Sequence, residues 1–399
     1  MDRRCGVYAR VRACARVCVP YPANRVHFTI PSDIPSQYAP YVDVTTPSPF
    51  TGPLWVAGDN ALYFTDTITA TIYKLPVPPS DGGGAAQPAQ PAQPHVIDAG
   101  GYDGSNCANY ERLAEPGSNG MALDGTGHAI ICQHPTARII RVRLSDIPPK
   151  TPFYQTNFAV VASSPPGGKA RRFNSPNDVV VHPVDGSVWF TDPIYGMLEK
   201  DKFCDELKDG RSYLDEASVA RGAGCKGVYR VAAGPVAAAA DAGEGGDEVA
   251  PAYSPATLMS TALHRPNGLA FSPDGKTLYV ADSVLGCPSW TGFPVLNNNT
   301  LGAATVVLNR ASLNYTLGSI DGSGMPPPAT EGVADGFKVD AAGRIWSSSP
   351  NGLVVIDPAA RTVIAEVIFG TNISNVWFGA GGDVWVTGLG HVWKLHRKL

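Results

Sequence analysis

Six places along the chain share one pattern: a polar residue, an apolar run, a turn containing Gly and a second apolar run. We call the polar residues the heads of the six repeats. The heads are Thr51, Asn119, Asn177, Asn267, Asp335 and Asn375. Their amide, carboxylate and hydroxyl oxygens carry little charge and suit a hard cation such as Ca²⁺ better than a soft metal. The heads therefore indicate a divalent cation site, with Ca²⁺ ahead of Zn²⁺, Mg²⁺ or Mn²⁺.

Each repeat has the pattern of a β-hairpin. Between Asn267 and Asp282, two apolar runs flank Ser272–Lys276, in which Pro fixes one φ and Gly permits a positive φ. A lone hairpin is marginal in water, so further strands must complete each unit. Candidates for these strands are Thr71–Leu75, Arg138–Val142, Gly227–Val231, Ala304–Leu308 and Leu353–Ile356.

The repeats predict an all-β fold, a six-bladed β-propeller with four-stranded antiparallel blades around a central channel. A large β-sandwich is the alternative, but it would not repeat the polar head. In a propeller the innermost strands begin near one end of the channel, so the heads are expected to converge. A single Asn-Gly pair is most often turn chemistry. Recurrence favours a site at Asn177, Asn267 and Asp335, whereas Asn119 and Asn375 fit a structural role better.

Composition sets the limits of the domain. The chain has 399 residues, 44% of them hydrophobic and 17% charged, with a net charge of −4. Nothing in this balance indicates nucleic-acid or membrane binding, and no run approaches the roughly 18 apolar residues of a membrane span. We expect a poorly ordered N-terminal extension at 1–45 and the propeller, a monomer, at 46–399. Low-complexity loops are expected at about 79–95 and 233–252, and a charged insertion at about 197–226, either a lid or an inert surface segment.

The eight cysteines show no disulfide pattern. Cys132 lies in a predicted strand as buried packing, while Cys204 and Cys225 are candidates for pairing. A cytoplasmic protein with reduced thiols is the default expectation. The Arg-rich start does not resemble a secretory signal. A secreted or organellar protein would follow if the start site is misassigned or this segment is a transit peptide.

Two stretches resemble the SMP-30/gluconolactonase family of six-bladed propellers. They are Phe173–Gly196, which contains Ser-Pro-Asn-Asp and Phe-Thr-Asp-Pro, and Arg265–Asp282, which contains Arg-Pro-Asn-Gly. The resemblance covers about residues 46 to 399. It implies a lactone-hydrolysing enzyme whose single divalent cation is held by a first-repeat Glu, two Asn and one Asp. By motif, the two Asn and the Asp are Asn177, Asn267 and Asp335.

The first repeat departs from the family pattern. Where the family has Glu-Gly-Pro, this chain has Thr51-Gly52-Pro53. Loss of the carboxylate weakens cation binding, although Thr51 still offers a hydroxyl. Glu331, shortly before Asp335, is a conceivable substitute.

Several further side chains are candidates for the channel. Those expected to contact substrate are Thr51, Asn119, His134 and Tyr195, and His264 is a further channel candidate. Asp192 is better interpreted as the cap of a turn before Pro193. Asp66 and Asp282 hold the matching position of their own hairpins, which favours a structural role for all three.

The resemblance implies hydrolysis of a sugar-type or other small lactone. A cation polarises the carbonyl, and Asp335 orients the attacking water as well as ligating the metal. No Gly-x-Ser-x-Gly motif supports a serine nucleophile. Two alternatives stay open because of Thr51: a degenerate propeller that binds a small molecule or Ca²⁺ without turnover, and a related propeller hydrolase acting on phosphotriesters.

Overall fold

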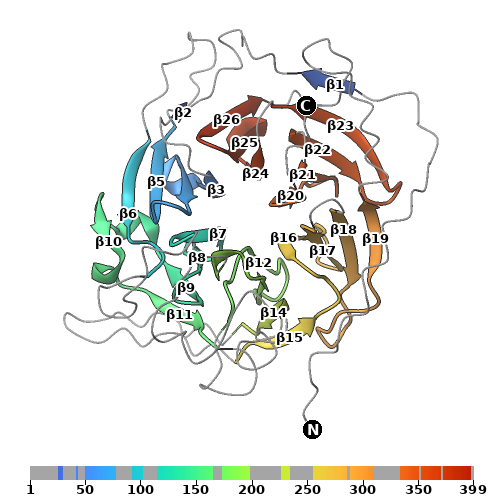
Figure 1. Ribbon diagram of the computed structural model, residues 1–399, viewed down its shortest axis with the longest axis horizontal. Coiled ribbons are helices and arrows are strands. Elements are labelled where there is room, and N and C mark those ends of the chain that lie inside the picture. Colours follow the sequence, from blue (N-terminus) through green and yellow to red (C-terminus); the bar gives the residue numbers. More distant parts are fainter. Residues whose placement is uncertain are drawn as a thin grey trace. The chain divides into compact units, whose positions relative to one another are not determined.

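The computed structural model has an all-β fold, a six-bladed β-propeller with four sheets of four strands and two of five (Figure 1). It divides into two compact units: residues 1–64, 75–92 and 262–399, and residues 65–74 and 93–261. The structure describes residues 26–29, 42–43, 50–77, 92–101, 115–164, 173–197, 226–233, 255–284, 288–309, 333–349, 352–369 and 372–396. Within these ranges no helix is long and apolar enough to cross a membrane.

Blades 1 to 3 follow one another along the first part of the chain. Blade 1 contains β3 (Phe50–Val56), β4 (Ala61–Asp66), β5 (Thr71–Pro76), β6 (Gln93–Ile97) and β10 (Thr151–Pro152), with η1 (Ala57–Asp59) between β3 and β4. Blade 2 contains β7 (Ser118–Leu123), β8 (Ala129–Gln133), β9 (Arg138–Val142) and β11 (Ala159–Ala162), with η3 (Leu144–Asp146) and η4 (Phe153–Gln155) before β11. Blade 3 contains β12 (Val179–Val181), β13 (Val188–Asp192), β14 (Gly227–Val231) and β15 (Thr257–Ser260), with η5 (Tyr195–Met197) after β13.

Blades 4 to 6 lie in the unit that contains residues 262–399. Blade 4 contains β16 (Pro266–Phe271), β17 (Thr277–Asp282), β18 (Ser289–Pro294) and β19 (Thr305–Asn309). Blade 5 contains β20 (Phe337–Val339), β21 (Ile345–Ser349), β22 (Gly352–Asp357), β23 (Thr362–Ile368) and β1 (Val26–Thr29). Blade 6 contains β24 (Ile373–Phe378), β25 (Asp383–Gly388), β26 (His391–His396) and β2 (Val42–Asp43), with η8 (Ala380–Gly382) between β24 and β25.

The hairpin turns have the backbone that the sequence predicts. Gly275 of the Ser-Pro-Asp-Gly-Lys turn has φ 71°, and Gly186 and Gly343 have φ 67° and 80° in the matching turns of their blades. A side chain with a Cβ is strained in this region, which explains Gly at these positions. In blade 5 the Asp340 carboxylate accepts N–H bonds from Ala342 and Arg344 and so closes its turn.

Three boundaries differ from those expected. The segment Val26–Thr29 pairs in parallel with β23, and Val42–Asp43 pairs with β26. Parts of the expected extension therefore belong to blades 5 and 6, since they satisfy the backbone groups of edge strands. In blade 1, β6 begins at Gln93, inside the loop expected at 79–95.

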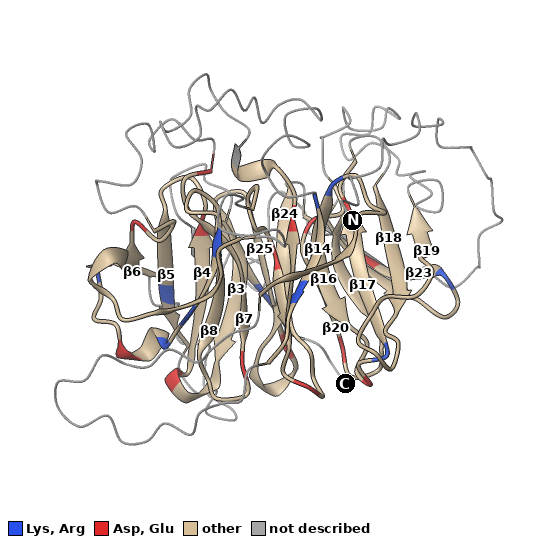
Figure 2. Cartoon of the chain, turned by 90° about the horizontal axis from the view of Figure 1, so that it is seen from below, with Lys and Arg blue, Asp and Glu red and all other residues tan. Residues whose placement is uncertain are grey.

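Large aromatic side chains are buried in the core of each unit. In blade 3, Phe173 meets Phe190 and Tyr229 edge-on at centroid distances of 5.1 Å. In blade 4, the Trp290 indole N–H donates to Ser347 Oγ of blade 5 at 2.8 Å. Charged residues are interspersed along the described strands and turns in Figure 2, in keeping with the net charge of −4. Cys132 is a free, fully buried thiol on β8, which confirms its interpretation as core packing.

Candidate functional site

Asn177, just before the first strand of blade 3, is nearly buried, but its side-chain amide is not used in hydrogen bonds to the described residues. The residue is 3% exposed. Its backbone N–H donates to Thr191 O at 2.9 Å, and its carbonyl accepts from Gly120 N at 2.7 Å. Its side-chain amide makes no hydrogen bond within the described part of the chain. The amide atoms of Asn177 are not fully enclosed, so this group is available to a ligand.

The glycine that follows a head donates its N–H to the head of the next blade in the same unit or to the residue just before that head. Gly120 N donates to Asn177 O at 2.7 Å, Gly268 N to Asp335 O at 3.2 Å, and Gly336 N to Ser374 O at 2.7 Å. A Cβ on Gly268 would lie 2.4 Å from Asp335 O. None of these three glycines has a positive φ. The Asn-Gly pairs therefore reflect close approach between blades rather than turn chemistry.

These contacts bring together the segments of Asn267 and Asp335 in one unit and those of Asn119 and Asn177 in the other. Asn267 is 5% exposed, and Asp335 is half-buried with its backbone N–H bonded to Ser348 Oγ at 2.8 Å. Asn119 is half-buried, and its carbonyl accepts from Thr65 Oγ1 at 3.0 Å.

A carboxylate holds the segment that leads to Asn177. The Asp192 side chain, 0% exposed, accepts the backbone N–H groups of Asn174 and Ser175 at 3.0 and 2.9 Å. The Asn174 side-chain amide adds a third bond at 3.0 Å. The sequence context of Asp192 indicates the cap of a turn before Pro193. This interpretation is wrong, since its partners lie in the loop before Asn177. The loop before the head, brought back by the hairpin, supplies the N–H donors instead.

Asp282 has the same role in blade 4. Its two carboxylate oxygens accept the N–H groups of His264 and Arg265 at 3.1 and 2.7 Å, just before Asn267. We call this arrangement in blades 3 and 4 the carboxylate clamp. Asp66 of blade 1 differs, because it accepts from Ile68 and Thr69 in the turn that follows it.

The environment of Asp192 changes its acidity. Burial raises the pKa of its carboxyl to about 8, and the hydrogen bonds from Asn174 and Ser175 offset only part of this effect. Desolvation also raises the pKa of the nearby Cys132 thiol, with the Asp178 and Asp192 carboxylates adding to the effect.

His134 is fully enclosed at the end of the blade 2 hairpin. Its Nδ1 lies 3.1 Å from Glu115 Oε2, a close contact without hydrogen-bond geometry. Its Nε2 has no hydrogen-bond partner among the described residues. A Cβ on Gly196 would lie 2.5 Å from the imidazole, so His134 packs against the turn that contains the half-buried Tyr195.

Two other heads have structural surroundings. Asn375 is 2% exposed, and its Oδ1 accepts from Val376 N at 2.8 Å and Lys338 Nζ at 3.3 Å. Thr51 is 6% exposed on β3, and the carbonyl of the preceding Phe50 accepts a bond from Ser374 Oγ.

Some predicted residues lie outside the described ranges. They are Glu331, Cys204 and Cys225. Across the part of the chain that the structure describes, no group of three or more His, Cys, Asp or Glu is arranged to hold a metal.

Sequence reasoning did not assign Glu115 or the partners of the two clamp carboxylates. Asp192 and Asp282 do occupy the same position in their hairpins, which is a usable signal. The third and second residues before each head, the actual partners, have no shared side-chain type, because they bond through backbone N–H.

Comparison with known proteins gives consistent results. The SMP-30/Gluconolactonase/LRE-like region model matches residues 50–389. A gluconolactonase of Zymomonas mobilis is 27% identical over 350 residues, 83% of this chain and 73% of that protein. A lactonohydrolase of Aspergillus oryzae is 30% identical over 159 residues, 37% of this chain and 33% of that protein.

Solved structures agree on the fold. A gluconolactonase from Xanthomonas campestris has a TM-score of 0.57 at 22% identity, with 88% of this chain and 87% of that one covered. Regucalcin from Agrobacterium tumefaciens, a calcium-binding protein, has a TM-score of 0.50 at 13% identity, with 92% and 94% covered. Because the family model matches residues 50–389, nearly all of the propeller, the chain belongs to the SMP-30/gluconolactonase/LRE-like family.

Proposed function

We propose that this protein hydrolyses a small lactone, of sugar type or similar, with the help of a divalent cation. Family membership supports the reaction class, since the relatives include a gluconolactonase and a lactonohydrolase. The observation that carries the proposal is the nearly buried, unpartnered amide of Asn177 at the position of a family ligand.

The donor chemistry of the proposed ligands fits a hard cation. Asn177, Asn267 and Asp335 offer two amide oxygens and one carboxylate, the oxygen types that Ca²⁺ accepts. Such a site needs no cluster of charged ligands, and the described residues provide none.

When bound, the cation supplies a Lewis acid that polarises the lactone carbonyl. The carboxylate of Asp335 accepts a hydrogen bond from the attacking water and orients it towards the carbonyl carbon. The clamps hold the Asn177 and Asn267 segments in place before substrate arrives, which lowers the reorganisation needed in the transition state. Tyr195 and Asn119, both half-buried, would contact the hydroxylated body of the substrate, whereas the enclosed His134 supports the turn that contains Tyr195.

Turnover of glucono-1,5-lactone by the purified chain, with and without a chelator, tests the proposal. We expect hydrolysis that EDTA abolishes and Ca²⁺ restores. Asn177→Ala, Asn267→Ala and Asp335→Ala should each lose at least about 100-fold in kcat/KM, as expected for removal of a group that stabilises the transition state. Asp274→Asn, an exposed turn carboxyl, should leave turnover unchanged. Full activity in excess chelator would contradict the metal mechanism.

Thr51 supports the second candidate, binding without turnover. It stands where the family places a Glu, and it is buried at 6% exposure without a carboxylate. Calorimetry of Ca²⁺ binding to the wild type and to Thr51→Glu separates the two. A large gain in affinity together with new turnover would mean that the natural protein is a binder. Unchanged affinity and turnover would mean that Thr51 lies outside the cation's reach.

A further inference from the structure

Blade 2 has a cavity of about 250 Å³ whose lining includes His128, Arg141, Arg143 and Asp146. β7 leads away from the head Asn119, and the turn at Asp124–His128 follows its far end. β9 starts beside Gln133 and ends with Val142 beside Ala129, next to that turn. The cavity therefore lies at the opposite end of the blade from the head and is separate from the proposed lactone site.

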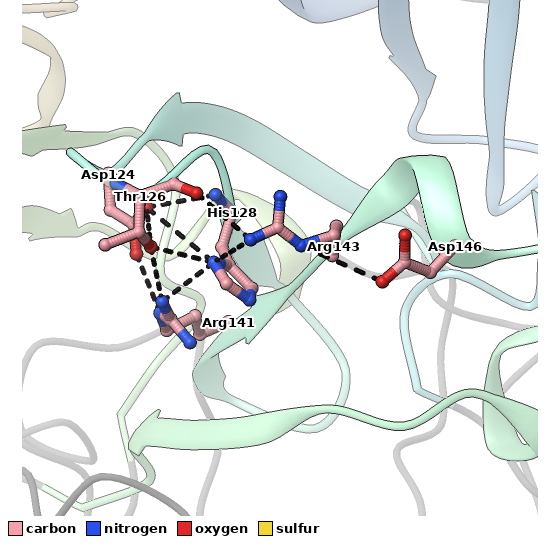
Figure 3. A network of polar contacts seen from close by, with 6 residues as sticks. All are labelled: Asp124, Thr126, His128, Arg141, Arg143 and Asp146. Atoms are coloured by element: carbon pink, nitrogen blue, oxygen red, sulfur yellow. Dashed lines mark hydrogen bonds and ion pairs between the residues drawn. The ribbon is translucent and has the colours of Figure 1, made fainter. Parts of the chain in front are cut away.

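Arg141 is fully committed to the turn. Its Nε donates to Asp124 Oδ2 at 2.7 Å, and one Nη donates to Thr126 Oγ1 at 2.7 Å and to His128 Nδ1 at 2.8 Å (Figure 3). Although burial opposes ionisation of Asp124, bonds from His128 N, Arg141 and Thr126 outweigh it and lower the pKa of that carboxyl. The charge of Arg141 is thus balanced by a stable carboxylate.

Arg143 lacks such a partner. It points to the same side of the strand as Arg141, since side chains alternate between faces. One Nη donates to the neutral carbonyl of Thr126 at 3.1 Å, and its Nε lies 3.7 Å from Asp146 Oδ2. The Asp146 side chain is 70% exposed and stands at the edge of the network in Figure 3. Water screens such a pair strongly, so little holds Asp146 on the guanidinium.

We propose that this cavity binds a small oxyanion, a carboxylate or phosphate group, through Arg143 in place of Asp146. A guanidinium offers paired N–H donors that match the two oxygens of such a group. Gln155, Thr156 and Asn157, which also line the cavity, would hydrogen-bond to the polar body of the ligand. The site takes an anionic small molecule, and it does not depend on the hydrolase activity.

Isothermal titration of the full chain in low salt and EDTA tests this site, with sodium gluconate and inorganic phosphate as the probes and glucose as a neutral control. EDTA removes any contribution from the proposed cation. We expect one site for an oxyanion and none for glucose, and binding that weakens as NaCl screens the charge. The probe that binds with the higher affinity shows whether the site prefers a carboxylate or a phosphate group.

Two variants with opposite expected effects on oxyanion affinity exclude unfolding as the explanation for weaker binding. Arg143→Gln should weaken binding about tenfold or more, since a charged bidentate contact is lost. Asp146→Asn should tighten it about threefold, because the competing carboxylate is neutralised. Lys276→Gln, which removes one positive charge from an exposed turn outside the cavity, should change nothing. Equal affinity in wild type and both cavity variants, equal binding of glucose, or no binding in EDTA would overturn the proposal.

Discussion

The segments before Asn177 and Asn267 are held by the same hydrogen-bonding arrangement, but the two carboxylates are buried to different extents. In both, one carboxylate accepts the N–H groups of the third and second residues before the Asn. Asp192 is 0% exposed and takes a third donor from the Asn174 side chain, whereas Asp282 is 7% exposed and accepts from two backbone N–H groups. Equal geometry with unequal burial means that the two blades position their Asn alike but depend on the clamp to different extents.

Removal of the clamp carboxylate should have the largest effect. Asp192→Ala leaves three enclosed donors unsatisfied, so we expect the free energy of unfolding to fall by about 4 kcal/mol. Asp282→Ala should cost about 2 kcal/mol, since fewer donors and more water are involved. Urea unfolding measures both, with Lys276→Gln as an exposed control. Equal losses would show that burial does not distinguish the two clamps.

Substitution of the glycines that follow the heads should have the next largest effect on stability. Gly268→Ala brings a Cβ to 2.4 Å from Asp335 O, and Gly120→Ala brings one to 2.2 Å from Asp178 Oδ1. We expect each to lose about 2–3 kcal/mol of stability, and Gly268→Ala also to lower lactone turnover by moving Asp335. The control is Gly58→Ala, which meets nothing within 4 Å. Stability equal to that of the control would refute close approach as the reason for these glycines.

Titration of Asp192 should give a smaller, pH-dependent effect. Its pKa is raised from 3.8 to about 8, so between these values the folded state holds a proton that the unfolded state has lost. The free energy of unfolding should therefore fall as pH rises from 5 to 8, by at most about 1.4 kcal/mol per pH unit. Asp192→Asn should lack this contribution. Parallel pH profiles for the two proteins would exclude a raised pKa.

The hydroxyls that support each clamp should matter least. Ser175 Oγ donates to Pro193 O at 3.0 Å and accepts from Gly196 N at 3.1 Å, while Ser283 Oγ donates to Ala334 O beside Asp335. We expect Ser175→Ala and Ser283→Ala each to cost about 1 kcal/mol. Each should also reduce turnover, Ser175→Ala by loosening the Asn177 segment and Ser283→Ala by loosening the segment that carries Asp335. Thermal unfolding and a lactone assay together separate the two effects.

Much of the fold is readable in the sequence because the repeats have a fixed phase. The hairpins, the turn glycines such as Gly275 and strands such as Arg138–Val142 all appear where the pattern predicts them. The short strands Val26–Thr29 and Val42–Asp43 were not predictable. They form because the edges of β23 and β26 offer unpaired backbone groups, not because of their own alternation.

The candidate site was only partly predictable for a related reason. Head positions follow from the repeat, and so Asn177 and Asn267 are found at once. The role of Asp192 could not be predicted from the sequence, because a turn cap and a clamp both present an Asp at the end of a strand. Only the fold shows that its partners are the backbone N–H groups of Asn174 and Ser175, brought back by the hairpin.

The bonds from the head glycines also make the protein suitable for hydrogen–deuterium exchange. The amide hydrogens of Gly120, Gly268 and Gly336 are each donated to the neighbouring blade of the same unit. They exchange with solvent only when those two blades separate at the heads. Their protection factors would therefore report, blade by blade, the free energy of local opening around the proposed ligands. A bound cation or lactone would slow exchange first at the junctions that it links.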